Sequence, residues 1–492
     1  MSVKISEISK IGWKFDNTYV HLPNPMLSKL SPVPVKSPKI ATLNQTLANE
    51  LGLDFSSISN ENLAYVFSGN VLPKGSKSIA QAYAGHQFGH FTMLGDGRAI
   101  LIGEHINKKN QRFDIQFKGS GVTPYSRNGD GRAALGPMLR EYIISEAMFY
   151  LNIPTTRSLA VVTTGENVIR ETPLTGAILT RVASSHLRVG TFQYAAMLGD
   201  LKILKTLVDY SINRHYPNLK DEKNKALSLL EAVVRKQTEL VVNWMRVGFI
   251  HGVMNTDNMT ISGETIDYGP CAFMDTYDPE TVFSSIDHQG RYAYMNQPGI
   301  TKWNLFRFAE TLIPLIDDDE KKSIEIAQET VNKFNILYQE YWINMMRGKI
   351  GLFDNHKGDK NLINNLLSWM KKNKADYTNT FYSLMKEKIK EDKIFDNLEF
   401  INWYKQWKIR LEKNNKTLES SFNLMKKNNP AVIPRNHKVE EALDSANNNF
   451  NLKLVNSLLE VLKKPYTDRS EITNYQKPPI PNGTMYKTYC GT

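Results

Sequence analysis

The chain has 492 residues, 41% hydrophobic and 23% charged, as is usual for a globular protein with one large or several ordinary domains. No apolar run reaches the roughly 18 to 20 residues of a membrane span, and the N-terminus lacks the apolar core of a secretory signal. Two cysteines, Cys271 and Cys490, exclude a disulfide scaffold and a cysteine-rich zinc site. We therefore expect a cytoplasmic protein with no membrane partner.

The net charge of +11 indicates an anionic partner without identifying it. Nucleotide phosphates, nucleic acid and an acidic protein surface all satisfy this charge, whereas lysines that only decorate solvated helices are the alternative explanation. Because no nucleic-acid-binding signature with interleaved aromatic residues is present, we expect no nucleic-acid partner. We expect the protein to be a monomer.

Residues 1–75 are predicted to form an N-terminal extension that is largely extended and irregular. Five prolines between residues 23 and 38 each remove a backbone hydrogen-bond donor. One helix is predicted over residues 41–53, where apolar residues recur with a spacing near 3.6.

Residues 76–194 are predicted to form a sheet-rich, nucleotide-binding N-lobe. Strand-like runs occupy 99–105, 112–119, 158–166 and 176–183, and the second run alternates Phe113, Ile115 and Phe117. A helix is predicted over 137–151, with Pro137 in its first turn, where a missing N–H costs least.

Residues 195–470 are predicted to form a helical C-lobe, and 471–492 a C-terminal tail without periodicity. Long amphipathic helices are predicted over 202–216 and 224–248, followed by a β-hairpin at 258–269 with its turn at Ser262-Gly263. The predicted fold class is therefore α+β. A small sheet-rich lobe followed by a large helical lobe is also the layout of the bilobal protein-kinase-like enzymes.

The strongest chemical motif is HGVMNTDNMTISGETIDYG, residues 251–269. Asp257 and Asn258 precede the predicted hairpin, and Asp267 follows nine residues after Asn258. Hard oxygen ligands from a loop Asn and a later Asp are how kinases hold Mg²⁺ against phosphate oxygens. An Asx-rich turn followed by a strand end is the alternative explanation.

Lys118 ends a predicted strand, and Glu141 lies in the next predicted helix. Kinases pair such a lysine and glutamate to aim the ammonium group at nucleotide phosphates. Solvated surface side chains are the alternative, which the residues alone favour.

Two glycine-containing loops and several arginines lie near these elements. Gly95 and Gly97 flank Asp96 before a strand, and residues 119–132 contain four more glycines. Glycines allow backbone N–H groups to turn toward phosphate oxygens, although hairpin turns use them too. The arginines able to bind phosphate are Arg98, Arg127, Arg132, Arg181 and Arg188. Arg181 lies on an otherwise apolar strand and therefore needs an anionic partner, either a ligand or a structural carboxylate.

His86 and His90 are four residues apart, but no third metal ligand accompanies them, so we interpret them as packing residues.

From the residues alone, the chain is a metal-dependent enzyme acting on a nucleotide. Five long segments are similar to the selenoprotein O family. The resemblance extends from about residue 20 onward. These segments are 80–104, 113–148, 186–196, 251–275 and 287–298.

The resemblance implies a protein-kinase fold without the usual catalytic aspartate. Val253 occupies that position here, five residues before Asn258. Members of the family transfer AMP from ATP to Ser, Thr or Tyr hydroxyls of proteins and release pyrophosphate, and some bacterial members use UTP and Mn²⁺. An ordinary protein kinase and a non-catalytic nucleotide-binding scaffold are the alternatives; Val253 opposes the first, and the intact Asp257, Asn258 and Asp267 oppose the second.

The resemblance also implies a role for each matching residue. Asp257 would accept the proton of the attacking hydroxyl, with Lys118 and Glu141 completing the catalytic set. Asn258 and Asp267 would hold Mg²⁺ or Mn²⁺. The residues implied to bind ATP are Gly95, Gly97, Arg98, Lys118, Asp130, Gly131, Arg181, Arg188 and Asp267. A disulfide between Cys271 and Cys490 is implied as a possible redox switch, since family members can link a tail cysteine to one near the activation segment.

Overall fold

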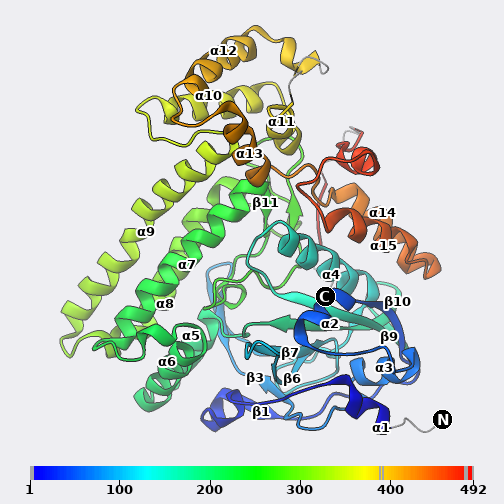
Figure 1. Ribbon diagram of the computed structural model, residues 1–492. Helices are drawn as coiled ribbons and strands as arrows, with labels where there is room; N and C mark the ends of the chain where they lie inside the picture. The colour runs from blue at the N-terminus through cyan, green and yellow to red at the C-terminus, as the bar shows by residue number, and fades with distance from the viewer. Residues whose placement is uncertain (1–4, 387–388, 390–392, 481–485, 490–492) are drawn as a thin grey trace.

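The computed structural model describes residues 5–386, 389, 393–480 and 486–489, and it has a mixed architecture of helices and sheet. The first part of the chain, blue to cyan in Figure 1, contributes the main sheet. The later part, green to red, is almost entirely helical. An α+β composition is therefore confirmed.

The main sheet has the strand order β1-β3-β6-β7-β10-β9-β2, and β8 pairs with β10. All of its pairs are antiparallel. Two further two-stranded sheets pair β4 with β5 and β11 with β12. The strands are β1 Leu27–Lys29, β2 Lys39–Leu43, β3 Ile79–Gln81, β4 Ala84–Gln87, β5 His90–Met93, β6 Ala99–Ile106, β7 Arg112–Lys118, β8 Ala133–Ala134, β9 Arg157–Ile169, β10 Pro173–Ala183, β11 Phe249–Ile250 and β12 Ala272–Phe273.

The four predicted strands are confirmed as β6, β7, β9 and β10. The expectation that residues 1–75 are largely irregular is wrong in one respect, because β1 and β2 complete the two ends of the main sheet. β2 pairs with β9, and β1 pairs with β3. These short strands depend on partners far away in the sequence, which local patterns do not reveal. The division of the chain at residues 75, 194 and 470 stays a prediction.

The helices form three groups in Figure 1. α4 packs on β9 and β10, with α14 and α15 against it; α7, α8 and α9 pack together; and α10 packs between α9 and α12. The helices are α1 Ile5–Ile8, α2 Gln45–Leu51, α3 Asn60–Phe67, α4 Leu135–Tyr150, α5 Val189–Met197, α6 Leu201–His215, α7 Lys225–Val247, α8 Gln297–Ile316, α9 Glu320–Lys349, α10 Asp359–Lys372, α11 Tyr377–Ser383, α12 Leu398–Glu412, α13 Leu418–Asn428, α14 Asn436–Asn449, α15 Lys453–Leu462 and α16 Thr473–Gln476.

The predicted hairpin at 258–269 is wrong. This segment contains no strand, and it is held from both sides instead, by a bridge between Thr260 and Arg188 and another between Thr265 and Thr155. Within the loop, the Thr260 hydroxyl accepts from the N–H of Glu264 and donates to its carbonyl oxygen. The side-chain hydroxyl therefore replaces the backbone ladder that a hairpin would have formed.

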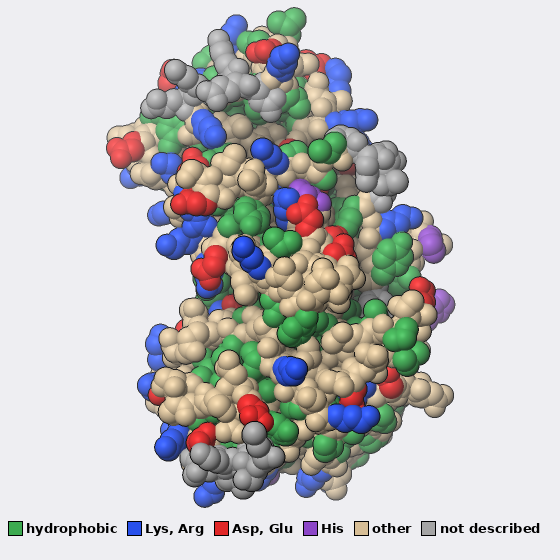
Figure 2. Space-filling view, turned by 90° about the vertical axis from the view of Figure 1, so that its right-hand side faces the viewer, with side chains coloured by type: hydrophobic (Ala, Val, Ile, Leu, Met, Phe, Trp, Pro, Cys, Tyr) green, Lys and Arg blue, Asp and Glu red, His purple; other side chains and the backbone are tan. Residues whose placement is uncertain are grey.

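No helix in the described part of the chain combines the length and apolarity needed to cross a membrane. On the face seen in Figure 2, basic and acidic side chains are interspersed. The net charge of +11 is thus not gathered into one basic patch on that face.

Candidate active site

A cavity of about 750 Å³ lies where the ends of β6 and β7, the start of α4 and the loop 253–270 meet. It collects residues that are far apart in the sequence. Every residue for which the sequence analysis expected a catalytic, nucleotide-binding or metal-binding role lines it: Gly95, Gly97, Arg98, Lys118, Asp130, Gly131, Glu141, Arg181, Arg188, Asp257, Asn258 and Asp267. Arg127, Arg132 and Val253 line it too. Their roles remain predictions.

Lys118 and Glu141 form a buried ion pair, with 2.8 Å between Nζ and Oε2. β7 ends at the lysine, and α4 presents the glutamate from within a mostly apolar helix. Arg181 of β10 binds the other carboxylate oxygen, with Nε at 2.6 Å from Oε1. Burial alone would raise the pKa of Glu141, but the two cations outweigh it and lower that pKa. Glu141 is therefore a fixed anion between two cations.

Asp267 closes the same ion cluster from the helical side. Its Oδ1 contacts the Lys118 ammonium and lies 3.0 Å from an Arg181 nitrogen. Burial raises the pKa of Asp267, yet Lys118 and Arg181 together hold it well below its usual range. The backbone of Asp267 has φ +67°, in the left-handed region that a non-glycine residue rarely occupies. Such strain persists where the surroundings fix a side chain for function.

Asp257 differs from these paired acids. It lies in the short 3₁₀ turn Thr256–Asn258, it is buried, and its Oδ1 has no hydrogen-bond partner. Burial raises the pKa of Asp257 to about 6. Arg188 lowers this pKa and Asp267 raises it, with smaller effects. A buried carboxylate oxygen without a partner is costly, and this one is enclosed by β4, since a Cβ at Gly85 would lie 2.8 Å from it.

Asn258 orients its amide through one contact, donating from Nδ2 to the Val253 carbonyl oxygen at 3.0 Å. That contact uses the donor end of the amide and leaves the oxygen end for a cation. The described residues contain no group of three His, Cys, Asp or Glu side chains that could bind a metal ion. A cation here would therefore depend on the carboxylate and amide oxygens of this loop together with oxygens of a ligand.

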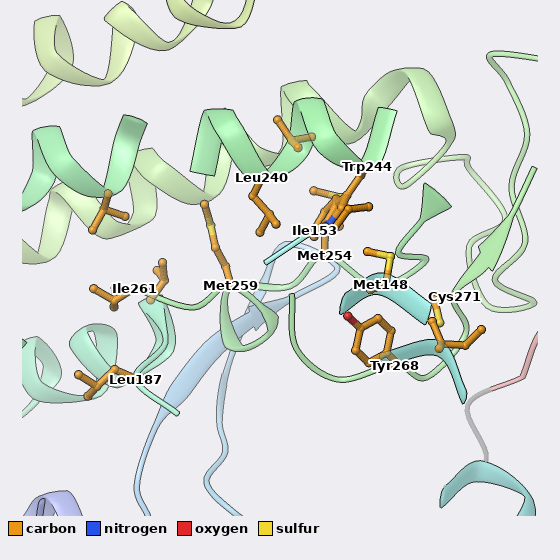
Figure 3. Close-up of a cluster of buried hydrophobic side chains, with 14 of the residues drawn as sticks. Met148, Ile153, Leu187, Leu240, Trp244, Met254, Met259, Ile261, Tyr268 and Cys271 are labelled. Carbon is orange, nitrogen blue, oxygen red and sulfur yellow. The ribbon is translucent and has the colours of Figure 1, made fainter. Parts of the chain in front are cut away.

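An apolar cluster beneath the loop fixes these polar side chains. Figure 3 shows Met254, Met259 and Tyr268 pointing into buried surroundings shared with Leu240 and Trp244 of α7. The loop thus alternates buried apolar anchors with the polar residues that line the cavity. Anchoring of this kind allows a loop without regular structure to hold its polar side chains in place.

The glycines in the cavity wall serve loop packing. A Cβ at Gly95 would lie 2.4 Å from the Tyr125 ring, and one at Gly97 would lie 2.7 Å from the Tyr125 carbonyl oxygen. The Thr123 hydroxyl also donates to the Asp96 carbonyl oxygen at 2.7 Å. The loop 119–132 is therefore folded against residues 95–98, and this packing requires glycine whether or not the loops also bind phosphate.

Sequence reasoning missed several residues of the cavity, including Asp96, Tyr83, Gln87 and Arg170. Asp96 could have been found, because it stands between Gly95 and Gly97. Its buried carboxylate accepts from the N–H of Gln81, and burial raises its pKa, with Arg188 acting in the opposite direction. The other three had no recognisable signal in the sequence.

Arg170 pairs with Asp130, with 2.8 Å between Nη1 and Oδ2. Asp130 is thus tied to the turn between β9 and β10. Arg188 is buried, and its guanidinium lies 4.4 Å from the centre of the Tyr83 ring. Stacking of this kind holds a cation in place without neutralising it.

His86 and His90 were predicted to be packing residues. They lie on the two strands of the β4–β5 hairpin. The His86 ring packs edge-on against Phe91 and Trp303, whereas His90 is exposed. The two histidines are therefore not on one helix face.

Cys271 is buried, and burial raises the pKa of its thiol to about 12. Cys490 lies outside the described residues. The predicted disulfide between them stays a prediction.

Comparison of the sequence with known proteins identifies its family and its relatives. Residues 10–463 match the family described as "Protein adenylyltransferase SelO". The chain is 61% identical over 482 residues to "Protein nucleotidyltransferase YdiU" of Pelagibacter ubique, covering 98% of this chain and 100% of the relative. Proteins of the same name from Nitrosococcus oceani and Bacillus thuringiensis are 58% and 56% identical, again over 98% of this chain and over 98% and 99% of their own lengths.

Proposed function

Because this chain belongs to the SelO family of protein adenylyltransferases, we propose that it transfers AMP from ATP to Ser, Thr or Tyr hydroxyls of proteins and releases pyrophosphate. The observation that carries the proposal is the arrangement of two kinds of acid around one cavity. Asp267 is bound by Lys118 and Arg181, whereas buried Asp257 keeps an oxygen without a partner. Such a site can hold a charged nucleotide and accept a proton beside it.

The proposal includes the fold. The main sheet with α4 would be the N-lobe of a kinase-like enzyme, and the helices from α5 onward would form its C-lobe. The Lys118–Glu141 pair between a strand and a helix supports this, because kinases use the same pair to aim an ammonium at phosphate oxygens.

In the proposed reaction, Asp257 orients the attacking hydroxyl and accepts its proton. A pKa of about 6 suits a general base near neutral pH, because most of the group is ionised while it still binds a proton effectively. Val253 occupies the position where an ordinary kinase carries its base, so Asp257 is the acid placed to act.

Mg²⁺ or Mn²⁺ would be held by Asn258 and Asp267. The available oxygen of the Asn258 amide and the partly exposed carboxylate of Asp267 fit a hard cation beside a phosphate. When bound, the cation would neutralise charge that develops on the departing pyrophosphate. Lys118 and Arg181 would bind phosphate oxygens beside the cation, since both are already held in the cavity by the Glu141 carboxylate that they share.

The remaining cavity residues would hold the rest of ATP. The loops around Gly95, Gly97 and Gly131 bring backbone close to the cavity, and Arg98, Arg188 and Asp130 supply charged groups there. UTP would meet the same phosphate-binding groups, so the preference between ATP and UTP depends on the nucleobase.

Parallel incubations with α-labelled and γ-labelled ATP and an acceptor protein test the proposal. We expect label in protein from the α position alone, and about 10²- to 10³-fold less incorporation by an Asp257→Asn variant. The matched control is Asp209→Asn, which removes an exposed carboxylate paired with Lys225 and should leave incorporation unchanged. Label from the γ position alone would identify an ordinary kinase, and label from neither position would identify a non-catalytic binding protein. A third incubation with α-labelled UTP measures nucleotide preference.

A further inference from the structure

A second surface of the molecule adjoins the cavity, formed by one side of the β4–β5 hairpin and by residues from the segment before α8 and from α8 itself. We call it the arginine–tryptophan surface and define it by His86, Phe91, Arg291, Trp303 and Arg307. Trp303 is its centre. The guanidinium groups of Arg291 and Arg307 lie 4.9 Å and 5.0 Å from the centre of its ring.

The charge of this surface is incompletely compensated. Arg307 pairs with Glu310 at 2.5 Å, whereas within the described residues the Arg291 guanidinium forms no ion pair and only the Arg291 backbone N–H reaches an acid, Asp287. The Nε atoms of both arginines are buried and lack hydrogen-bond partners. A guanidinium held on an aromatic ring without a carboxylate is prepared to bind an anion, because its position is already fixed.

The surface also carries apolar area. Phe91 is 47% exposed, and Met93, two residues later on the same side of β5, is 46% exposed. Large apolar side chains exposed beside an arginine without an ion pair indicate a partner that supplies both apolar and acidic groups.

The β4–β5 hairpin connects this surface directly to the reacting end of the cavity. Successive residues of β4 face opposite sides. His86 contacts Trp303, whereas Gln87 lines the cavity, and a Cβ at Gly85 would lie 2.8 Å from Oδ1 of Asp257. One strand therefore separates the surface from the carboxylate that we propose as the proton acceptor.

Two sets of hydrogen bonds hold the hairpin in this position. The His86 N–H donates to the Thr256 hydroxyl at 2.7 Å, and that hydroxyl donates to Gln193 of α5 at 2.6 Å. The Phe88 N–H and the Tyr292 hydroxyl both donate to Oδ1 of Asn255, at 3.1 and 2.7 Å. The arginine–tryptophan surface is thus rigidly placed relative to the catalytic loop.

We infer that the arginine–tryptophan surface binds an acidic segment of the protein substrate, next to the hydroxyl that receives AMP. This inference rests on the proposed function. The nucleotide is a poor occupant, because neither arginine lines the cavity, where Lys118, Arg98 and Arg181 already provide positive charge. The net charge of +11 also favours acidic partners over basic ones.

Binding of fluorescent peptides, measured by polarisation in EDTA and without nucleotide, tests the inference. One peptide carries a serine flanked by leucine and glutamate, a second has glutamine in place of glutamate, and a third has lysine. We expect the glutamate peptide to bind best. Arg291→Gln should weaken its binding about tenfold, as expected for the loss of one charge-assisted contact. The matched control is Arg235→Gln, an exposed arginine of α7 outside this surface, which should not change binding.

A charge-reversal variant distinguishes the loss of a specific contact from misfolding of the variant protein. Arg291→Glu should bind the lysine peptide better than the glutamate peptide, a gain that a damaged protein would not show. Equal binding of the glutamate and glutamine peptides, or unchanged binding by Arg291→Gln, would overturn the inference. So would self-association in sedimentation velocity that Arg291→Gln abolishes, since a second copy would then be the occupant. The assay involves no transfer, so a protein that fails the labelled-ATP experiment can still pass or fail this one.

Discussion

The cavity contains two kinds of acid, whose pKa values are shifted in opposite directions. Glu141 and Asp267 are surrounded by Lys118 and Arg181, and both have lowered pKa values. Asp257 is also buried, has a raised pKa, and leaves an oxygen without a partner. The comparison teaches that burial alone does not identify a reactive acid. What distinguishes Asp257 is burial that its partners compensate only in part, which costs stability and is expected only where a ligand or a reaction requires it.

The largest effect on transfer should come from removing Asp267, the partly exposed acid that pairs with Lys118 and Arg181. Asp267→Ala removes a proposed metal ligand and the partner of two cations, so transfer should fall about 10⁴-fold. Incorporation of α-labelled AMP into an acceptor protein measures this. Added Mg²⁺ or Mn²⁺ at high concentration should not restore it. Activity within tenfold of the parent protein would show that the metal is bound elsewhere.

Asp257→Asn changes the uncompensated acid and should lower transfer about 10²- to 10³-fold, because the proton acceptor is lost. Its free energy of unfolding at pH 8 should rise by about 1 kcal/mol, since a buried charge without a full set of partners is removed. Urea denaturation and the labelling assay together check both parts. A large loss of stability would mean that Asp257 is a structural residue.

Glu141→Gln applies the same isosteric change to the compensated group and should have the opposite effect on stability. Lys118 and Arg181 would keep only Asp267 as a counter-charge, and we expect a loss of about 3 kcal/mol in the free energy of unfolding. The matched control is Glu231→Gln, from the exposed pair with Lys333, which should change stability by less than about 1 kcal/mol. Equal effects in the two variants would remove the distinction between the groups.

The pH dependence of stability in EDTA should be smaller but opposite in sign for the two groups. Asp257 has a folded pKa of about 6, above its ordinary value, so it favours the folded state at low pH and loses that contribution as pH rises through about 6. Asp267 has a lowered pKa and favours folding above its ordinary pKa, with loss at more acidic pH. Between pH 5 and 7, Asp257→Asn should therefore remove a decline in stability. An unchanged slope would contradict the raised pKa.

Much of this site could be predicted from local patterns. Lys118 follows an alternating strand and Glu141 lies on an apolar helix, so each was placed on the correct element. That Lys118 also binds Asp267, 149 residues away, could not be predicted, because such contacts depend on how the elements pack. The loop 258–269 was misassigned because the Thr260 hydroxyl replaces strand hydrogen bonds. Asp96 was not predicted to be a cavity residue, although its neighbours Gly95 and Gly97 were predicted to bind ATP.

The central claim is that Asp257 serves transfer of AMP to a hydroxyl. Intact-mass and peptide mass spectrometry of an acceptor protein incubated with ATP and Mg²⁺ tests it most directly. The account predicts a mass increase equal to one AMP moiety on a Ser, Thr or Tyr residue, formed about 10²- to 10³-fold more slowly with Asp257→Asn and at an unchanged rate with Asp209→Asn. An increase equal to one phosphate, or an AMP adduct formed equally fast with Asp257→Asn, would contradict it.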